Sequence, residues 1–243
     1  MIITIFSEDD NAKRSMLAVN LAALRALDHH KVLLIDATAP EYSLNWSTQF
    51  NAAGVKSRFV VHGTENLESE LESPDSYYRT HYREIIIDAD GIDARSTDSA
   101  LLATDVLVVP IRSGQNDVRN RENLVQRIET SRLFNSALRV LVVEVQAISA
   151  FGDAATQAFN SAKVFAQKVL TATLAKTVIH EWIDDRRSFE QGLSVFESEP
   201  GNQHAAAEIK DLYQEISRIR DLPVEAAANN LAIMHAIQRR IHE

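Results

Sequence analysis

The 243-residue chain contains no cysteine and only 7 glycines. The lack of cysteine excludes a disulfide scaffold and any thiolate metal site, and it favours a cytoplasmic location. The glycine count is well below the usual share of about 7%. No glycine-rich loop of the kind that cradles phosphates occurs anywhere in the sequence.

Long apolar runs are also absent: none approaches the roughly 20 residues needed to cross a bilayer. Because the chain opens directly on a strand-like run, we expect neither a secreted nor a membrane-spanning protein. The net charge of -9 argues against nucleic-acid binding over the whole surface, although a local basic patch is compatible with it. The eight histidines form no metal-ligand pattern, and no Ser-His-Asp order or G-x-S-x-G elbow supports other hydrolase chemistry.

Buried strands alternate with amphipathic helices along most of the chain. The opening is a strand at Ile2–Phe6, a helix from Ser15 and a second strand at Val32–Ile35. Further strands are expected at 57–61, 84–88, 105–110, 138–145 and 177–179, with helices at 65–82, 116–134, 150–170 and 205–219. This order predicts an α/β fold: a doubly wound, mainly parallel sheet with helices on both faces.

The turn between the first strand and helix is where a P-loop would carry G-x-x-x-x-G-K-[ST]. In that motif the glycines let the backbone approach the phosphates closely, and amides at the helix N-terminus hold the phosphate oxygens. The lysine neutralises phosphate charge, and the Ser/Thr hydroxyl ligates magnesium. With the register fixed by Asn20-Leu21-Ala22, the turn resembles the deviant P-loop K-G-G-x-G-K-[ST]-[ST] of the ParA/MinD family of partition and positioning ATPases. The resemblance is closest to the small plasmid-partition ParA proteins and implies a P-loop fold.

Almost every chemical position of that turn differs from the family. Asp9 occupies the position of the family's signature lysine, Asp10 and Asn11 replace its paired glycines, and Lys13 replaces its last glycine. Arg14 replaces the P-loop lysine, and only Ser15 keeps the residue type. Like charges about 4 Å apart repel by roughly 4 kcal/mol at an effective dielectric near 20, so the acidic turn disfavours a triphosphate. We therefore expect a degenerate nucleotide site.

Two strand-terminal carboxylates match the family's catalytic positions. Asp36 corresponds to the first Asp of D-x-D-P-Q-x-S-L-x-x-W, of which Ser43-Leu44 is also retained, and Asp88 ends a strand that resembles Walker B. The resemblance implies that Ser15, Asp36 and Asp88 would surround magnesium if a magnesium–nucleotide complex still binds. The alternative for Asp36 is that it simply caps the following turn.

Arginines supply the candidate contacts to DNA or a partner. Those of the helix at 116–134 are Arg119, Arg121, Arg127 and Arg132, which form either a phosphate-contacting face or an ordinary solvated helix. The segment 183–197 resembles the family's closing segment, in which Arg186 and Arg187 would lie near the nucleotide and the dimer partner. They are equally suited to pair with Asp184 and Asp185.

The domain-sized part of the chain is 1–222, and 223–243 is a C-terminal extension. Its apolar residues, Leu231, Met234, Ile237 and Ile241, share one face of an expected helix, which suggests docking on its own domain or on a partner.

Two functions are compatible with these features. One is an active ParA-type switch that dimerises on ATP and binds nonspecific DNA. The other, which we favour, is a pseudo-ATPase that keeps the fold as a scaffold or adaptor in DNA partition or transfer. It would need no cofactor and would meet a ParB-like, centromere-binding or transfer protein in the bacterial cytoplasm. Asp9 or Asp10 would then mimic a bound anion and pair with Lys13 or Arg14.

Overall fold

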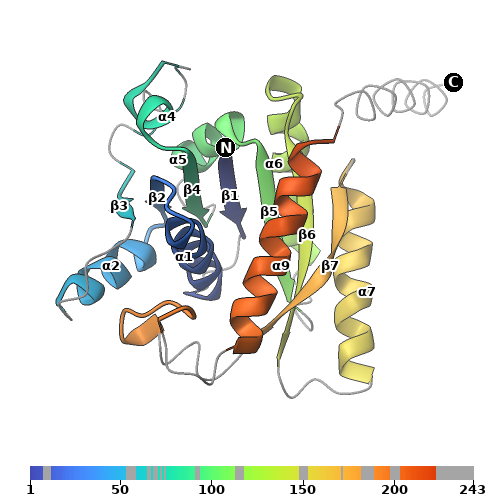
Figure 1. The fold of residues 1–243 in the computed structure, drawn as a ribbon. Coiled ribbons are helices and arrows are strands. Elements are labelled where there is room, and N and C mark those ends of the chain that lie inside the picture. Colours follow the sequence, from blue (N-terminus) through green and yellow to red (C-terminus); the bar gives the residue numbers. More distant parts are fainter. Residues whose placement is uncertain are drawn as a thin grey trace, which may run out of the picture.

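The computed structural model describes residues 1–7, 12–52, 59–64, 67, 71, 73, 75–90, 94–112, 118–147, 153–170, 172–181, 189–197 and 203–222. Strands and helices alternate along the described chain (Figure 1). They are β1 (Ile2–Phe6), α1 (Ala12–Leu27), β2 (Val32–Ala37), α2 (Tyr42–Ala52), β3 (Val60–His62), α4 (Tyr77–His81), β4 (Glu84–Ala89), α5 (Ala94–Ala103), β5 (Val106–Arg112), α6 (Val118–Phe134), β6 (Arg139–Ala147), α7 (Asp153–Lys168), β7 (Ala172–Glu181) and α9 (Gln203–Arg220).

All seven strands form one parallel sheet in the order β3-β2-β4-β1-β5-β6-β7. Side chains of a strand point alternately to opposite faces, so each strand contributes to two cores. In β1, Ile3 and Ile5 belong to one cluster, whereas Ile2 and Phe6 belong to the other. Burial on both faces explains the nearly continuous apolar runs of the central strands.

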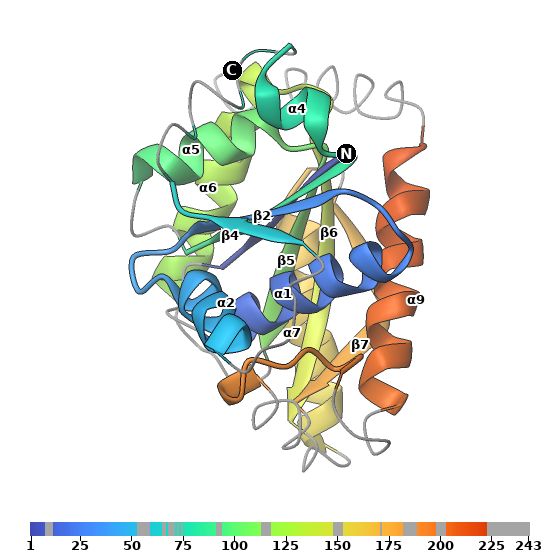
Figure 2. The same ribbon diagram turned by 60° about the vertical axis from the view of Figure 1, so that its left-hand side comes forward.

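Helices cover both faces of the sheet, as the sequence predicts (Figure 2). Apolar residues of α1 and α9 pack into the first cluster, for example Leu21 and Leu212. Apolar residues of α5, α6 and α7 pack into the second, for example Leu101, Ile128 and Phe165. No helix among the described residues is long and apolar enough to cross a membrane.

The structure corrects several predicted bounds. Strand β7 is longer than the predicted 177–179, and α2 was not expected as a helix. Of the helix predicted at 65–82, the described chain shows α4 at Tyr77–His81. The predicted extension 223–243 lies outside the described residues.

Strand β7 owes its extra length partly to carboxylates of α9. Around an irregularity in its pairing with β6, the amides of Lys176 and Thr177 donate to Glu215 at 2.8 and 2.7 Å. Nearer the end of the strand, the amide and Nδ1 of His180 contact Glu208 at 2.9 and 2.7 Å. These side-chain bonds satisfy backbone donors that an edge strand otherwise exposes, and sequence periodicity does not reveal them.

The first apolar cluster, into which α1 and α9 pack, should contribute strongly to the free energy of unfolding. Leu34 of β2 is fully buried there, so Leu34→Ala is expected to lower the free energy of unfolding by about 2–5 kcal/mol through lost apolar contact and a residual cavity. Urea denaturation measures this loss. The control is Val164→Ala, at an exposed position of α7, where a change within about 0.5 kcal/mol is expected. Equal losses at the two positions would contradict the assigned core.

Candidate functional site

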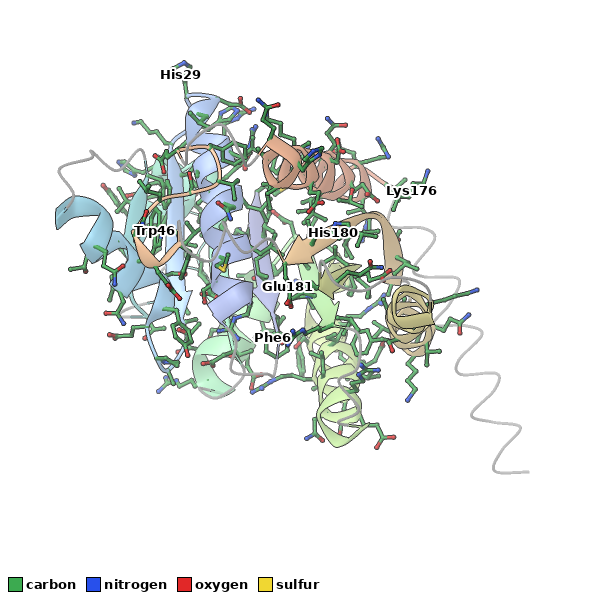
Figure 3. The ribbon with its side chains drawn as sticks, turned by 90° about the horizontal axis from the view of Figure 1, so that it is seen from below. Phe6, His29, Trp46, Lys176, His180 and Glu181 are labelled. Carbon is green, nitrogen blue, oxygen red and sulfur yellow. The ribbon has the colours of Figure 1, made fainter. Side chains whose placement is uncertain are left out.

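The candidate site lies where β1, β2 and β4 end. Sheet register pairs Asp36 of β2 with Asp88 of β4, and Asp88 with Ile5 of β1. Both carboxylates therefore stand side by side at the carboxyl edge of the sheet, the edge at which open parallel sheets bind ligands. Figure 3 views the molecule from this edge, with Phe6 near its middle and Trp46 to one side.

Arg14 is a cation of the site, and its guanidinium bonds other residues of the same chain. Its Nε donates to Asp88 Oδ1 at 2.6 Å, and its Nη1 donates to the carbonyl of Ser7 at 3.3 Å. The side chains of Arg14 and Asp88 are 1% and 0% exposed. A buried charge is stable only when it is paired and hydrogen-bonded. A phosphate that competed for Nε would have to open this ion pair.

Asp36 acts as a remote cap of α2. Its Oδ1 accepts bonds from the amide and hydroxyl of Thr38 at 3.0 and 2.7 Å, and its Oδ2 accepts one from the amide of Leu44 at 2.8 Å. Leu44 lies in the first turn of α2, where amides lack partners within the helix. The capping alternative for Asp36 is therefore the role that its described contacts support.

Burial and the neighbouring Asp88 carboxylate raise the pKa of Asp36 above its ordinary value of 3.8. The bonds from Thr38 and Leu44 act in the opposite direction because they stabilise the ionised form. Two adjacent acids thus share one edge of the sheet, with the guanidinium of Arg14 bonded to Asp88.

Two more bonds fix the connection between β2 and α2. The hydroxyl of Ser43 donates to Asp88 Oδ2 at 2.8 Å, and the amide of Ala39 donates to Asp90 Oδ2 at 2.9 Å. Asp88 therefore receives Arg14 on one oxygen and Ser43 on the other. Carboxylates at a helix N-terminus also interact favourably with the helix dipole.

The middle of α2 is held by an aromatic stack. The ring of Trp46 lies 5.8 Å from that of Phe59 and 6.4 Å from that of Phe189, centroid to centroid. Phe189 belongs to the closing segment, 183–197, of which residues 189–197 are described. Helix α1 also holds this segment, because the amide of Val195 donates to Asn20 Oδ1 at 2.9 Å. Helices α1 and α2 and the closing segment are thereby joined at this site.

Ser15 offers a feature that fits a missing ligand. Its hydroxyl is fully buried and has no hydrogen-bond partner among the described residues. The remaining groups fit poorly: Arg14, Asp36 and Asp88 are bonded to protein atoms. As they stand, the described residues do not fit a magnesium–nucleotide complex held in the manner that the family resemblance implies.

Several predicted site residues cannot be placed. Asp9, Asp10, Asn11, Arg186 and Arg187 lie outside the described residues, as does the side chain of Lys13, whose backbone belongs to the first turn of α1. The predicted pairing of Asp9 or Asp10 with Arg14 or Lys13 thus stays a prediction.

The arginines of α6 do not share one described surface. Arg127 Nε donates to Asp98 of α5 at 2.9 Å, and its guanidinium lies 5.9 Å from the centre of the Phe6 ring. Arg132 is buried and donates to the carbonyl of Leu170, and burial lowers its pKa. Arg121 is half-buried, and the side chain of Arg119 lies outside the described part of α6. Arg127 and Arg132 thus join α6 to α5 and to the end of α7.

Sequence reasoning missed three functional residues of the site: Thr38, Ser43 and Asp90. Ser43 belongs to a motif that the sequence retains, but nothing in the motif reveals that its hydroxyl bonds Asp88 across 45 residues. Spacing could have suggested Thr38, because a hydroxyl two residues after an aspartate commonly closes a local turn.

Comparison with known proteins gives the fold. No protein-family model matches the sequence, and no curated protein sequence does. Among solved structures, a plasmid partition protein from Borrelia burgdorferi bound to AMPPNP is 17% identical, with 88% of this chain and 98% of that chain covered and a TM-score of 0.60. McdA from Cyanothece, without nucleotide, is 14% identical, with coverage of 87% and 98% and a TM-score of 0.64.

A third similar structure is the cell division protein MinD from Aquifex aeolicus. It is 15% identical, with 88% of this chain and 97% of that chain covered and a TM-score of 0.59. The likeness extends over nearly the whole of each relative, so the fold of this chain is the fold of ParA-like partition proteins, McdA and MinD, as the sequence resemblance implied.

Removal of the site's cation should be costly. Arg14→Met leaves the fully buried Asp88 without its ionic partner, so the free energy of unfolding should fall by about 3–5 kcal/mol. Denaturant titration measures the fall, and Arg83→Met at an exposed position is the matched control. The double variant Arg14→Met/Asp88→Asn should lose less than the sum of its two single variants. A loss below about 1 kcal/mol in Arg14→Met would contradict the buried pair.

The raised pKa of Asp36 predicts a pH dependence of stability. The native state binds the Asp36 proton more tightly than the unfolded state does, so protonation stabilises the fold. This contribution is complete below pH 3.8 and is lost as the pH rises through the higher native pKa. The unfolding free energy of wild type minus that of Asp36→Asn should therefore decrease as the pH rises from 3.8 through the native pKa of Asp36. A difference that increases would show that the native pKa is lowered instead.

Proposed function

We propose that this chain, which has the fold of ParA-like partition proteins, McdA and MinD, acts in the partition, positioning or transfer of DNA as a scaffold that does not use nucleotide. The single observation that carries the proposal is the buried ion pair between Arg14 and Asp88. In this pair, the side chain that stands at the position of the P-loop lysine bonds the carboxylate that corresponds to the Walker B acid.

The energetics of this pair favour an internal role. A nucleotide phosphate that took Nε of Arg14 from Asp88 would leave that carboxylate buried beside Asp36. Breaking a buried pair in this way costs several kcal/mol. Arginine also differs from lysine here, because its planar fork is suited to the paired contacts that it makes with Asp88 and the Ser7 carbonyl.

Helix α2 supplies the second part of the argument. Its first turn is bonded to Asp36 and Asp88 through Leu44 and Ser43, with no ligand needed to complete either contact. Trp46 then packs α2 between Phe59 and Phe189. We infer that α2 keeps one position irrespective of nucleotide, so the surface around it serves as a constant binding face.

The partner that fits this role is a protein. Two described arginines of α6, Arg127 and Arg132, bond to other residues of the chain, which weakens the case for a DNA-binding face on that helix. A centromere-binding or ParB-like protein, or a component of DNA transfer, would bring the scaffold to DNA. The proposal places the protein in the bacterial cytoplasm, in agreement with its lack of cysteine.

An active ATP switch is the second candidate, and one observation favours it. The buried hydroxyl of Ser15 has no partner in the described part of the chain, although buried polar groups are nearly always satisfied. A magnesium ion would satisfy it. In that case Ser15, Asp36 and Asp88 would hold the ion, and the site would supply phosphoryl-transfer chemistry.

Calorimetric titration of ATP and ADP with magnesium into the full chain distinguishes these candidates, with sedimentation run on the same samples. The scaffold predicts no binding at millimolar nucleotide and no change of assembly state, because Arg14 stays with Asp88. ATP binding together with a shift from monomer to dimer would overturn the scaffold and establish the switch.

The variant Asp10→Gly/Asn11→Gly/Arg14→Lys provides the matching gain-of-function control. It restores three features of the family's turn in a chain that is otherwise unchanged. Measurable ATP binding by this variant alone would assign the loss in wild type to the turn and to Arg14. Arg83→Lys, a charge-conserving change at an exposed position, controls for nonspecific effects.

A further inference from the structure

Exposed apolar side chains gather where α5, α6 and α9 end. Four of the seven large apolar side chains that the described surface exposes are found there: Leu102, Leu133, Phe134 and Leu222. We call these four the α6-end patch. Leu133 and Phe134 are 74% and 79% exposed. Single exposed apolar residues are common, but a group of them marks a surface that binds something.

Hydrogen bonds bring the three helix ends together. Asn135, directly after α6, donates from Nδ2 to the carbonyls of Leu101 and Thr104 at 3.1 and 2.8 Å, which places the end of α5 beside the end of α6. Arg139 bonds the carbonyls of Ala137 and Leu222 at 2.8 and 3.0 Å. This guanidinium joins the loop after Phe134 to the last described residue of the chain.

Figure 1 shows the same arrangement, with the ends of α6 and α9 at one edge of the molecule. The described chain thus ends on the α6-end patch, and 21 residues, 223–243, follow it in the sequence. Their sequence carries an apolar stripe at helical spacing: Leu231, Met234, Ile237 and Ile241. A helix requires such a stripe to be buried against another surface.

We propose that residues 223–243 dock their apolar stripe on the α6-end patch of the same chain. The length of chain between Leu222 and the apolar stripe permits this docking. Leu231 lies nine positions after Leu222, a distance of about 14 Å along a helix or about 30 Å in an extended chain. Phe134 is three residues from Ala137, which Arg139 links to Leu222. Attachment at Leu222 also gives the segment a high effective concentration at the patch, an advantage that a separate partner lacks.

Docking of this kind has a consequence for assembly. The segment covers Leu133 and Phe134, and it thereby keeps two chains from associating through these residues. The patch lies at the opposite edge of the sheet from Asp36 and Asp88, because α5 and α6 end just before β5 and β6 begin, and Arg139 at the start of β6 bonds Leu222. The inference is therefore independent of the proposed function.

The absence of cysteine in the natural chain allows a clean cross-linking test. In the full-length protein, Phe134→Cys is combined with Ile237→Cys, and disulfide formation is followed under mild oxidation. The expected result is a cross-link within one chain that forms at least about tenfold faster than in the controls and at a rate that dilution does not change.

Two control pairs match this variant. Phe134→Cys with Ala236→Cys places the second thiol one residue from Ile237, on the side of the expected helix opposite the apolar stripe. Gln49→Cys with Ile237→Cys places the first thiol at an exposed position of α2. Equal rates in all three pairs would overturn the proposal. Cross-linked dimers that disappear on dilution would overturn it in favour of a second copy as the occupant.

Trypsin cleavage after Arg239 and Arg240 gives an independent readout. Because Leu133 and Phe134 are exposed, Leu133→Ser/Phe134→Ser should leave the fold intact while releasing the segment. Cleavage at these two arginines should accelerate at least severalfold in this variant. An unchanged rate would show that the patch does not hold the segment.

Discussion

The ion pair between Arg14 and Asp88 is the constraint on which the rest of the site depends. Neither group can stay charged inside the sheet's edge without the other, because desolvating a lone charge costs several kcal/mol. The pair fixes the first turn of α1 against the end of β4. Asp88 then orients Ser43, and through Ser43 it orients the start of α2. The positions of two helices thus follow from one contact.

Under the proposed function, this arrangement is a self-contained site that needs no ligand. In the P-loop motif, phosphate and magnesium neutralise the charges that gather at the ends of the strands. Here a guanidinium, two hydroxyls and backbone amides take over that task for Asp36 and Asp88. The fold is that of ParA-like partition proteins, McdA and MinD, whereas Arg14 stands where the P-loop motif has lysine.

The sequence allowed most of the fold to be predicted, because strands buried on both faces give continuous apolar runs and amphipathic helices give a period near 3.6. Helix α2 was not predicted, because its polar sequence, YSLNWSTQFNA, shows no apolar stripe. The extra length of β7 depends on Glu208 and Glu215, which lie in a helix that follows it in the sequence.

For the site, the sequence identified Asp36, Asp88, Arg14 and Ser15 as neighbours through the resemblance, and the register of β2 and β4 brings the two acids together. What the sequence could not give was the direction of Arg14. Pairing with Asp88, 74 residues away, depends on side-chain geometry, and the predicted pairing with Asp9 or Asp10 lies outside the described residues.

The most direct test of the central claim is a nuclear magnetic resonance measurement of the Arg14 Nε–H group, assigned by its loss in Arg14→Lys. The account predicts a slowly exchanging signal, shifted by its bond to Asp88, that is the same with and without millimolar magnesium–ATP. A rapidly exchanging signal, or one that moves when magnesium–ATP is added, would contradict it and show that Arg14 is available to a phosphate.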